Sequence, residues 1–309
     1  MGGKQRIYKQ RIASTQTLGK VFRAMEMIAA SRIGAARRAA SDLGPYDKAL
    51  TQAVAAVAVH TDLDHPLTRE REDSKRVAVL AVASDRGMAG AYSATILRET
   101  ERLISQLHER GKEVVLYTCG RRALQYFRFR GVGIERSWEG GSDAPQRETS
   151  TEVAQVLLER FLDVDPTTGV SEVHLVYTRF KSMMSQVPDV RQMLPLTVVD
   201  TPSSDAEREG ELGWVSRPEL TFPEYEFTPS PEAVLDGLLP LYVESRIHNV
   251  LLQAAASELA SRQRAMHTAT ENAEELITKY TRLANSARQA EITQEISEIV
   301  GGADALVRG

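Results

Sequence analysis

The chain has 309 residues, and 42% of them are hydrophobic, which is enough apolar material for one core or two. Its formal net charge is −4. Its one cysteine, Cys119, excludes an intrachain disulfide and a CxxC metal site and fits a reducing compartment. No apolar run approaches the roughly 20 residues that a membrane-spanning helix needs.

The first segment, residues 1–60, is expected to be helical, because its apolar residues recur every three or four positions. This spacing is typical of a coiled-coil seam. Gly44 and Pro45 are expected to break the helix, which resumes as a second piece to about His60. The residues expected to form the seam are Leu18, Phe22, Met25, Ala29, Ile33, Ala36, Ala40 and Leu43.

This first helix is strongly basic. Residues 1–40 contain nine Lys or Arg and one acid, Glu26. Such a helix is often a solvated face, but it also favours an acidic partner, a membrane surface or nucleic acid. A mitochondrial presequence has the same composition, although the helical pattern continues without a cleavage-like break.

The middle segment, residues 75–200, alternates short β-branched runs with helix-compatible stretches. This alternation predicts a parallel sheet covered by helices, that is, a Rossmann-like domain. Residues 184–196, MSQVPDVRQMLPL, are expected to form an extended loop beside the sheet. Strands are expected at 76–84, 113–120 and 172–180, and helices at 93–110, 121–131 and 151–162.

The stretch SDRGMAGAYS, residues 84–93, stands between a predicted strand and a predicted helix, where a phosphate-binding loop would lie. It matches neither G-x-G-x-x-G nor a P-loop, and no lysine is placed to neutralise phosphates, so a tight turn is the simpler interpretation. The histidines show no metal-ligand spacing. We therefore expect no cofactor and no metal site, and no motif marks a catalytic nucleophile–histidine–acid set, although spacing alone leaves one open.

Residues 201–231 are rich in Pro, Ser, Glu and aromatic residues and are expected to form an irregular foot segment. Residues 232–309 are expected to form one long helix, because the 60 residues from Leu241 to Val300 include no glycine or proline. At about 1.5 Å per residue, these span roughly 90 Å. Gly301 and Gly302 are expected to end the helix. Heptad spacing runs through Ala269, Ala273, Leu276, Tyr280, Leu283, Ala287 and Ala290.

Together these segments predict the fold class α/β, with a long antiparallel N-/C-terminal helical coiled coil and an inserted Rossmann-like parallel-sheet domain. The C-terminal helix is longer than its partner, so its end is expected to project alone. Its apolar stripe then needs an apolar socket on another chain, because isolated helices are held mainly by packing. The stripe consists of Ile292, Ile296, Ile299 and Val300, and polar residues beside it are Arg288, Gln289, Thr293 and Glu295.

Several stretches resemble one known family, the gamma subunit of the bacterial F-type ATP synthase, over nearly the whole chain. They are RIASTQTLGKVFRAMEMIAASR, SDRGMAGAYS, MSQVPDVRQMLPL, YVESRIHNVLLQAAASELASRQRAMHTATENA and, most specifically, ARQAEITQEISEIVGGA. The resemblance implies a non-catalytic central rotor shaft that couples rotation of the c-subunit ring to the conformational cycle of the beta catalytic sites. Its partners are then three alpha and three beta chains, epsilon and the c ring, at the cytoplasmic face of the plasma membrane.

The resemblance also implies roles for particular residues. Beta-subunit contacts fall to Arg23, Met25, Arg288, Gln289, Thr293 and Glu295, an apolar bearing to Ile299, Val300 and Leu306, and the foot against the c ring and epsilon to Tyr225 and Phe227. Four positions depart from the family. Ala89 and Ala91 stand in the turn at residues 84–93 where cysteine and glycine are usual. Arg23 stands where lysine is usual, and Thr228 stands where some relatives have an acid.

Two other functions fit parts of the sequence. An α/β nucleotide-binding protein with helical arms predicts affinity of the isolated chain for ATP or NAD. A nucleic-acid-binding coiled coil predicts steeply salt-dependent DNA binding by the basic first helix, whereas a shaft predicts co-purification with alpha and beta chains. The acidic remainder of the chain argues against nucleic acid, and membrane association is expected only through the complex.

Overall fold

The computed structural model describes residues 3–60, 66–68, 74–199, 214–216 and 227–307. The chain forms two compact units. One consists of residues 30–261, and the other combines the chain ends, 1–29 and 262–309. The boundaries of the four segments expected from the sequence stay a prediction.

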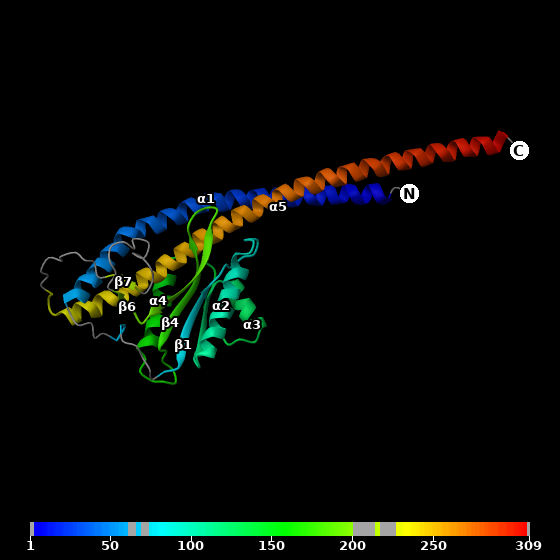
Figure 1. Cartoon of the computed structure of the whole chain (residues 1–309). Helices are drawn as coiled ribbons and strands as arrows, with labels where there is room; N and C mark the ends of the chain where they lie inside the picture. Colours follow the sequence, from blue (N-terminus) through cyan, green and yellow to red (C-terminus); the bar gives the residue numbers. More distant parts are fainter. Residues whose placement is uncertain (1–2, 61–65, 69–73, 200–213, 217–226, 308–309) are drawn as a thin grey trace. The chain divides into compact units, whose positions relative to one another are not determined.

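A five-stranded sheet forms the centre of the unit of residues 30–261 (Figure 1). The strand order is β3-β2-β1-β4-β5, and every neighbouring pair is parallel except β4 with β5. The order reverses beside β1, as in doubly wound α/β folds. The α/β fold class is confirmed. The strands are β1 Arg76–Val82, β2 Glu113–Cys119, β3 Arg136–Trp138, β4 Glu172–Phe180 and β5 Gln186–Leu194.

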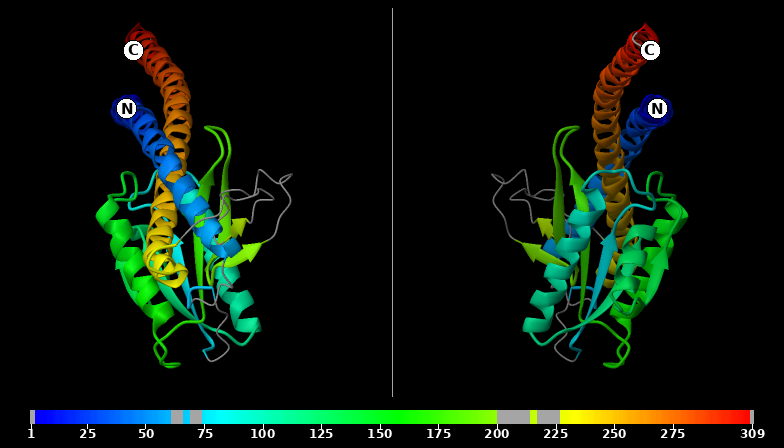
Figure 2. Two further views of the ribbon diagram at one scale, coloured as in Figure 1. Left: turned by 90° about the vertical axis from the view of Figure 1, so that its left-hand side faces the viewer. Right: turned by 90° about the vertical axis from the view of Figure 1, so that its right-hand side faces the viewer.

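The two faces of the sheet bury different helices. Along β1, alternate residues point to opposite faces, so Val79 packs with α2 (Tyr92–Glu109) and α3 (Arg121–Phe129), and Leu80 packs on the other face. That other face carries α4 (Arg147–Leu162). Figure 2 shows α2 and α4 on opposite sides of the sheet.

Two long helices complete the core on the α4 face. They are α1 (Gly3–His60) and α5 (Pro231–Val307), each of which contributes to both units. Residues 231–261 of α5 provide much of this core through Leu239, Tyr242 and Ile247, which are fully buried. The sequence predicted the helix but not that these residues pack on the sheet.

The expected break at Gly44 and Pro45 is wrong, because α1 continues through Pro45. A proline inside a helix removes one backbone hydrogen bond and strains the preceding turn. Tertiary contacts directly after it hold the helix together. Asp47 accepts hydrogen bonds from Ser245 and Arg246 of α5, and Leu50 enters the core.

The expected loop at residues 184–196 is also wrong, because residues 186–194 form the edge strand β5. Pro188 lacks an N–H group, but on an edge strand that side of the backbone needs no partner. The short strand β3 was missed, since three residues carry too little periodicity to be recognised.

The expected foot segment lies mostly outside the described residues. Of it, the structure describes residues 214–216, which form strand β7 (Trp214–Ser216), and residues 227–230, which precede α5. Strand β7 pairs in parallel with β6 (Thr197–Val199).

Candidate functional site: the paired terminal helices

In the unit formed by the chain ends, the start of α1 pairs with the second half of α5. As residue numbers rise along α1, those of its contacts on α5 fall, so the helices are antiparallel, as predicted. Tyr8 stacks on Tyr280 with ring centroids 6.4 Å apart, and Glu26 Oε1 lies 3.0 Å from His267 Nδ1. Between these contacts Gly19 faces Ala273 so closely that a Cβ atom added to Gly19 would lie 3.6 Å from the Ala273 Cβ.

The seam on α5 differs in detail from the predicted one. Ala273 and Ala284 are buried, whereas Leu276 and Leu283, which the heptad pattern placed in the seam, are exposed. On α1, Leu18 is likewise exposed instead of buried. Small residues at the contact allow the helices to approach closely, which leaves the bulkier leucines at the margin.

Arg23 already has a partner within this unit. Its guanidinium lies 2.7 Å from Glu274 of α5, and both side chains are largely exposed. Such an exposed ion pair contributes little stability. Met25 is half-buried towards the seam, whereas Met27 is exposed. Arg23 is therefore open to a further contact, while Met25 mainly packs inside the unit.

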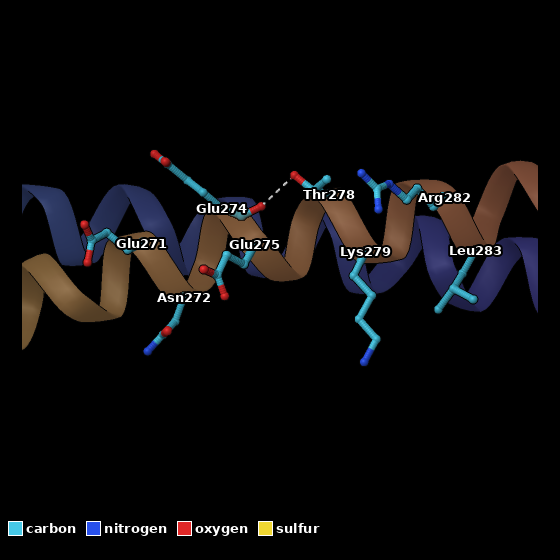
Figure 3. A pocket seen from close by; sticks show the side chains of 8 residues that line it. All are labelled: Glu271, Asn272, Glu274, Glu275, Thr278, Lys279, Arg282 and Leu283. Atoms are coloured by element: carbon cyan, nitrogen blue, oxygen red, sulfur yellow. Dashed lines mark hydrogen bonds between the residues drawn. The ribbon is translucent and has the colours of Figure 1, made fainter.

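A groove of about 920 Å³ runs along α5 in the same unit (Figure 3). Charges of opposite sign are separated along it. Glu271, Glu274 and Glu275 lie at one end, and Lys279 and Arg282 lie at the other. The sequence did not single out these residues, because charges on a helix surface usually indicate only a solvated face.

The end of α5 extends past the start of α1. Because Tyr8 lies opposite Tyr280, Gly3 reaches only to about Ala284, which is the last buried residue among the described side chains of α5. In Figure 1 the end of α5 accordingly lies beyond the start of α1. Exposure of the apolar stripe then rises from 44% at Ile292 to 72% at Ile299.

The four polar residues predicted on this end are all exposed. The Thr293 hydroxyl donates to the Gln289 carbonyl at 2.9 Å, which is a contact within the helix. Arg288 and Glu295 form no ion pair with any residue that the structure describes. They are therefore available to a partner.

The expected helix end at Gly301 and Gly302 is wrong, because α5 continues through both glycines to Val307. Glycine is tolerated inside a helix at a cost of about 1 kcal/mol relative to alanine. The side chains of the predicted bearing residues Val300 and Leu306 lie outside the described residues. Ile299 is the one predicted bearing residue whose side chain is described.

The other predicted residues lie elsewhere. Tyr225 is outside the described residues. Phe227 is partly buried and packs against the core of the α/β unit, so part of its surface is already used. A second set of exposed apolar residues lies on α1 and consists of Leu18, Val21, Met27 and Ile28. Sequence reasoning had placed Leu18 in the seam and did not single out Val21.

The crevice at the carboxyl ends of β1, β2 and β3 is where doubly wound sheets usually bind ligands. Here the Asp85 carboxylate accepts hydrogen bonds from the backbone N–H groups of Arg121, Gly140 and Ser142 at 3.0, 3.0 and 2.9 Å. Partial burial alone would raise the pKa of Asp85, but these hydrogen bonds outweigh it and lower the pKa. The Asp85 carboxylate thus already accepts hydrogen bonds from the backbone N–H groups that could otherwise bind a phosphate.

Across the described ranges, no group of three or more His, Cys, Asp or Glu residues is placed to hold a metal ion. In the same ranges, no helix is both long and apolar enough to cross a membrane.

Comparison with known proteins agrees with the resemblance. A family model described as ATP synthase matches residues 4–306. The ATP synthase gamma chain of Beutenbergia cavernae is 62% identical over 306 residues and covers 99% of both chains. The chain belongs to the ATP synthase gamma chain family. The gamma chain of a Nocardioides species is 54% identical over 301 residues, covering 97% of this chain and 96% of that one.

Solved structures show the same fold for this gamma chain family member. A chain of the mitochondrial ATP synthase of Euglena gracilis, in an OSCP/F1/c-ring structure, aligns with a TM-score of 0.65 at 16% identity, covering 99% of this chain and 95% of that one. A chain of the Tetrahymena thermophila central stalk and c-ring structure aligns with a TM-score of 0.55 at 20% identity, covering 81% and 99%.

Proposed function

We propose that the chain is the central rotor shaft of an F-type ATP synthase, coupling rotation of the c ring to the conformational cycle of the beta catalytic sites. The observation that carries this proposal is the exposed apolar surface on both paired helices. Ile292, Ile296 and Ile299 line the end of α5, while Val21 and Ile28 lie on α1. Exposed apolar residues grouped in this way favour burial in another polypeptide.

We propose that the end of α5 enters an apolar sleeve of the alpha–beta ring. Fully burying an isoleucine side chain contributes about 1.5–3 kcal/mol, so its three isoleucines can supply substantial binding energy without directional bonds. Contacts without fixed hydrogen-bond geometry suit a bearing in which the shaft turns. We extend this bearing to Val300 and Leu306 on the resemblance alone.

The polar residues are proposed to contact the beta subunits. Arg288 and Glu295 lack ion-pair partners among the described residues, so they can form charged contacts with loops of the beta subunits, together with Gln289 and Thr293. Arg23 would exchange its exposed pair with Glu274 for an acidic beta loop, at little cost in stability. We assign Met25, a half-buried residue, only a supporting role.

We propose that the chain itself catalyses no reaction. A rotor can change the beta sites only through contacts that differ in energy between their conformations. The filled crevice at Asp85 supports this, because its three N–H donors already have a partner. The membrane-attached partners would be the c ring and epsilon, contacted through a foot that includes Tyr225 and Phe227.

The proposal is tested in membranes that hold the assembled complex. The chain should co-purify with alpha and beta chains. Arg288→Ala should lower ATP synthesis in membrane vesicles several-fold without changing nucleotide binding to isolated beta chains. The matched control is Arg38→Ala, an exposed arginine of α1 in the other unit. Unchanged synthesis would remove Arg288 from the contact residues, and a chain recovered without alpha and beta would refute the shaft.

A further inference from the structure

We propose that the groove between α2 and α3 docks an acidic segment of a partner polypeptide that also inserts an apolar side chain. This rests on the proposed function, because the assembled complex supplies the partner. The groove measures about 560 Å³ and lies on the side of the sheet that α2 and α3 cover. The lining residues that matter are Ala94, Leu97, Arg98, Arg122, Tyr126 and Phe129.

The groove presents apolar residues to the outside, and helix geometry explains their position. On α3, Phe127 is buried against the sheet, and this orientation places Arg122, Tyr126 and Phe129 on one outer stripe at i, i+4 and i+7. Phe129 is 93% exposed, and Ala94 lies exposed across the groove. An apolar side chain inserted between α2 and α3 would cover the Phe129 ring.

The charge of the groove is uniformly positive. Its lining includes two arginines and no acid. Among the residues that the structure describes, neither Arg98 nor Arg122 forms an ion pair, whereas the nearby Arg102 and Arg130 are paired with glutamates. Two free guanidinium groups on facing helices match a segment that carries two carboxylates.

The combination favours a polypeptide over a small anion. A phosphate or nucleotide phosphate would satisfy the arginines but leave the ring of Phe129 in water. An acidic segment with an apolar anchor covers both, and buried aromatic and arginine residues are the groups that contribute most at protein interfaces. In a chain with a net charge of −4, a positive groove is also a local exception that steers acidic partners.

The test places a photo-crosslinking phenylalanine derivative at Phe129 in the complex assembled in membranes. We expect an adduct with a polypeptide of the complex, mapped by mass spectrometry to a segment with at least two Asp or Glu residues. The double change Arg98→Glu with Arg122→Glu should lower the yield at least tenfold. Arg128→Glu, an exposed arginine of α3 outside the groove, should leave it within about twofold. The crosslinker at exposed Val164 should give no such adduct.

Salt provides a second measurement that needs no arginine variant. Raising KCl from about 50 to 500 mM should reduce the yield at Phe129 several-fold, because screening weakens contacts between exposed charges. An adduct with lipid, an adduct with a segment lacking acids, protection by added ATP, or equal yields in the arginine variants would each overturn the proposal. Co-purification with alpha and beta chains but no adduct overturns the groove alone, whereas loss of co-purification by the unmodified chain overturns the shaft.

Discussion

The buried ion pair between α1 and α5 offers the sharpest test of how the α/β unit is held together. Arg246 Nη1 lies 3.0 Å from Asp47 Oδ2, and both residues are buried. Asp47 also accepts a hydrogen bond from the Ser245 hydroxyl at 3.0 Å, and the guanidinium lies over the Tyr242 ring. Asp47→Ala removes the carboxylate from a buried cation, which costs about 3–5 kcal/mol.

The assay is urea unfolding of the full chain followed by tryptophan fluorescence. Both tryptophans belong to the unit of residues 30–261, so the signal reports on that unit. The double variant Asp47→Leu with Arg246→Met replaces the pair with apolar residues of similar size and should lie within about 1 kcal/mol of the unsubstituted chain. Glu99→Ala, which removes an exposed pair with Arg102, should cost less than about 0.5 kcal/mol.

Two outcomes would refute this reasoning. If Asp47→Ala costs no more than Glu99→Ala, the pair does not hold the helices together. If the double variant is as unstable as the single one, the loss comes from the changed shape and not from a buried charge left without its carboxylate.

Three further predictions concern stability and assembly. Asp85→Asn should destabilise the α/β unit by about 1.5–3 kcal/mol at pH 7, because three backbone N–H donors lose a charged acceptor. Since the pKa of Asp85 is lowered on folding, the difference in unfolding free energy between the two chains should shrink as pH falls below about 4. A difference in urea unfolding that stays constant with pH would count against this prediction. Hydrogen bonding from His174, opposed by burial and aided by Lys112, lowers the pKa of Glu172 to about 2. Its contribution of about 2 kcal/mol should be full above about pH 4.5 and disappear as pH falls towards 2, and Glu172→Gln should flatten that acid transition. Deleting residues 297–309 should lower the thermal stability of the complex of this chain with the alpha–beta ring, whereas rotation should remain. A complex of unchanged thermal stability would contradict the bearing.

Much of this architecture could be predicted from local patterns. The strands at 76–84, 113–120 and 172–180 were predicted to within two residues, because short β-branched runs between helical stretches have few other solutions. The antiparallel pairing of the chain ends followed from helix length and apolar spacing. The projecting end of α5 followed from the difference between the two lengths.

Which of two neighbouring residues on α5 turns towards α1 could not be predicted from the sequence. Leu276 and Ile277 both fit a seam, and so do Leu283 and Ala284, yet the partner helix decides which of each pair turns inward. The close approach beside Gly19 selects the small alanine and leaves the leucines outside. Helix spacing alone does not contain this information, because it depends on the shape of the opposing surface.

The sequence by itself therefore determined the main helices, three of the five strands of the central sheet and the family, since these depend on local propensity, on the absence of helix breakers and on matched motifs. Only the tertiary structure decided that Pro45 lies inside a continuous helix, that Asp85 fills the crevice of the sheet, and that Phe129 lines a positive groove. The physical reason is that each of these depends on contacts between residues far apart in the chain, whose energies outweigh local preference.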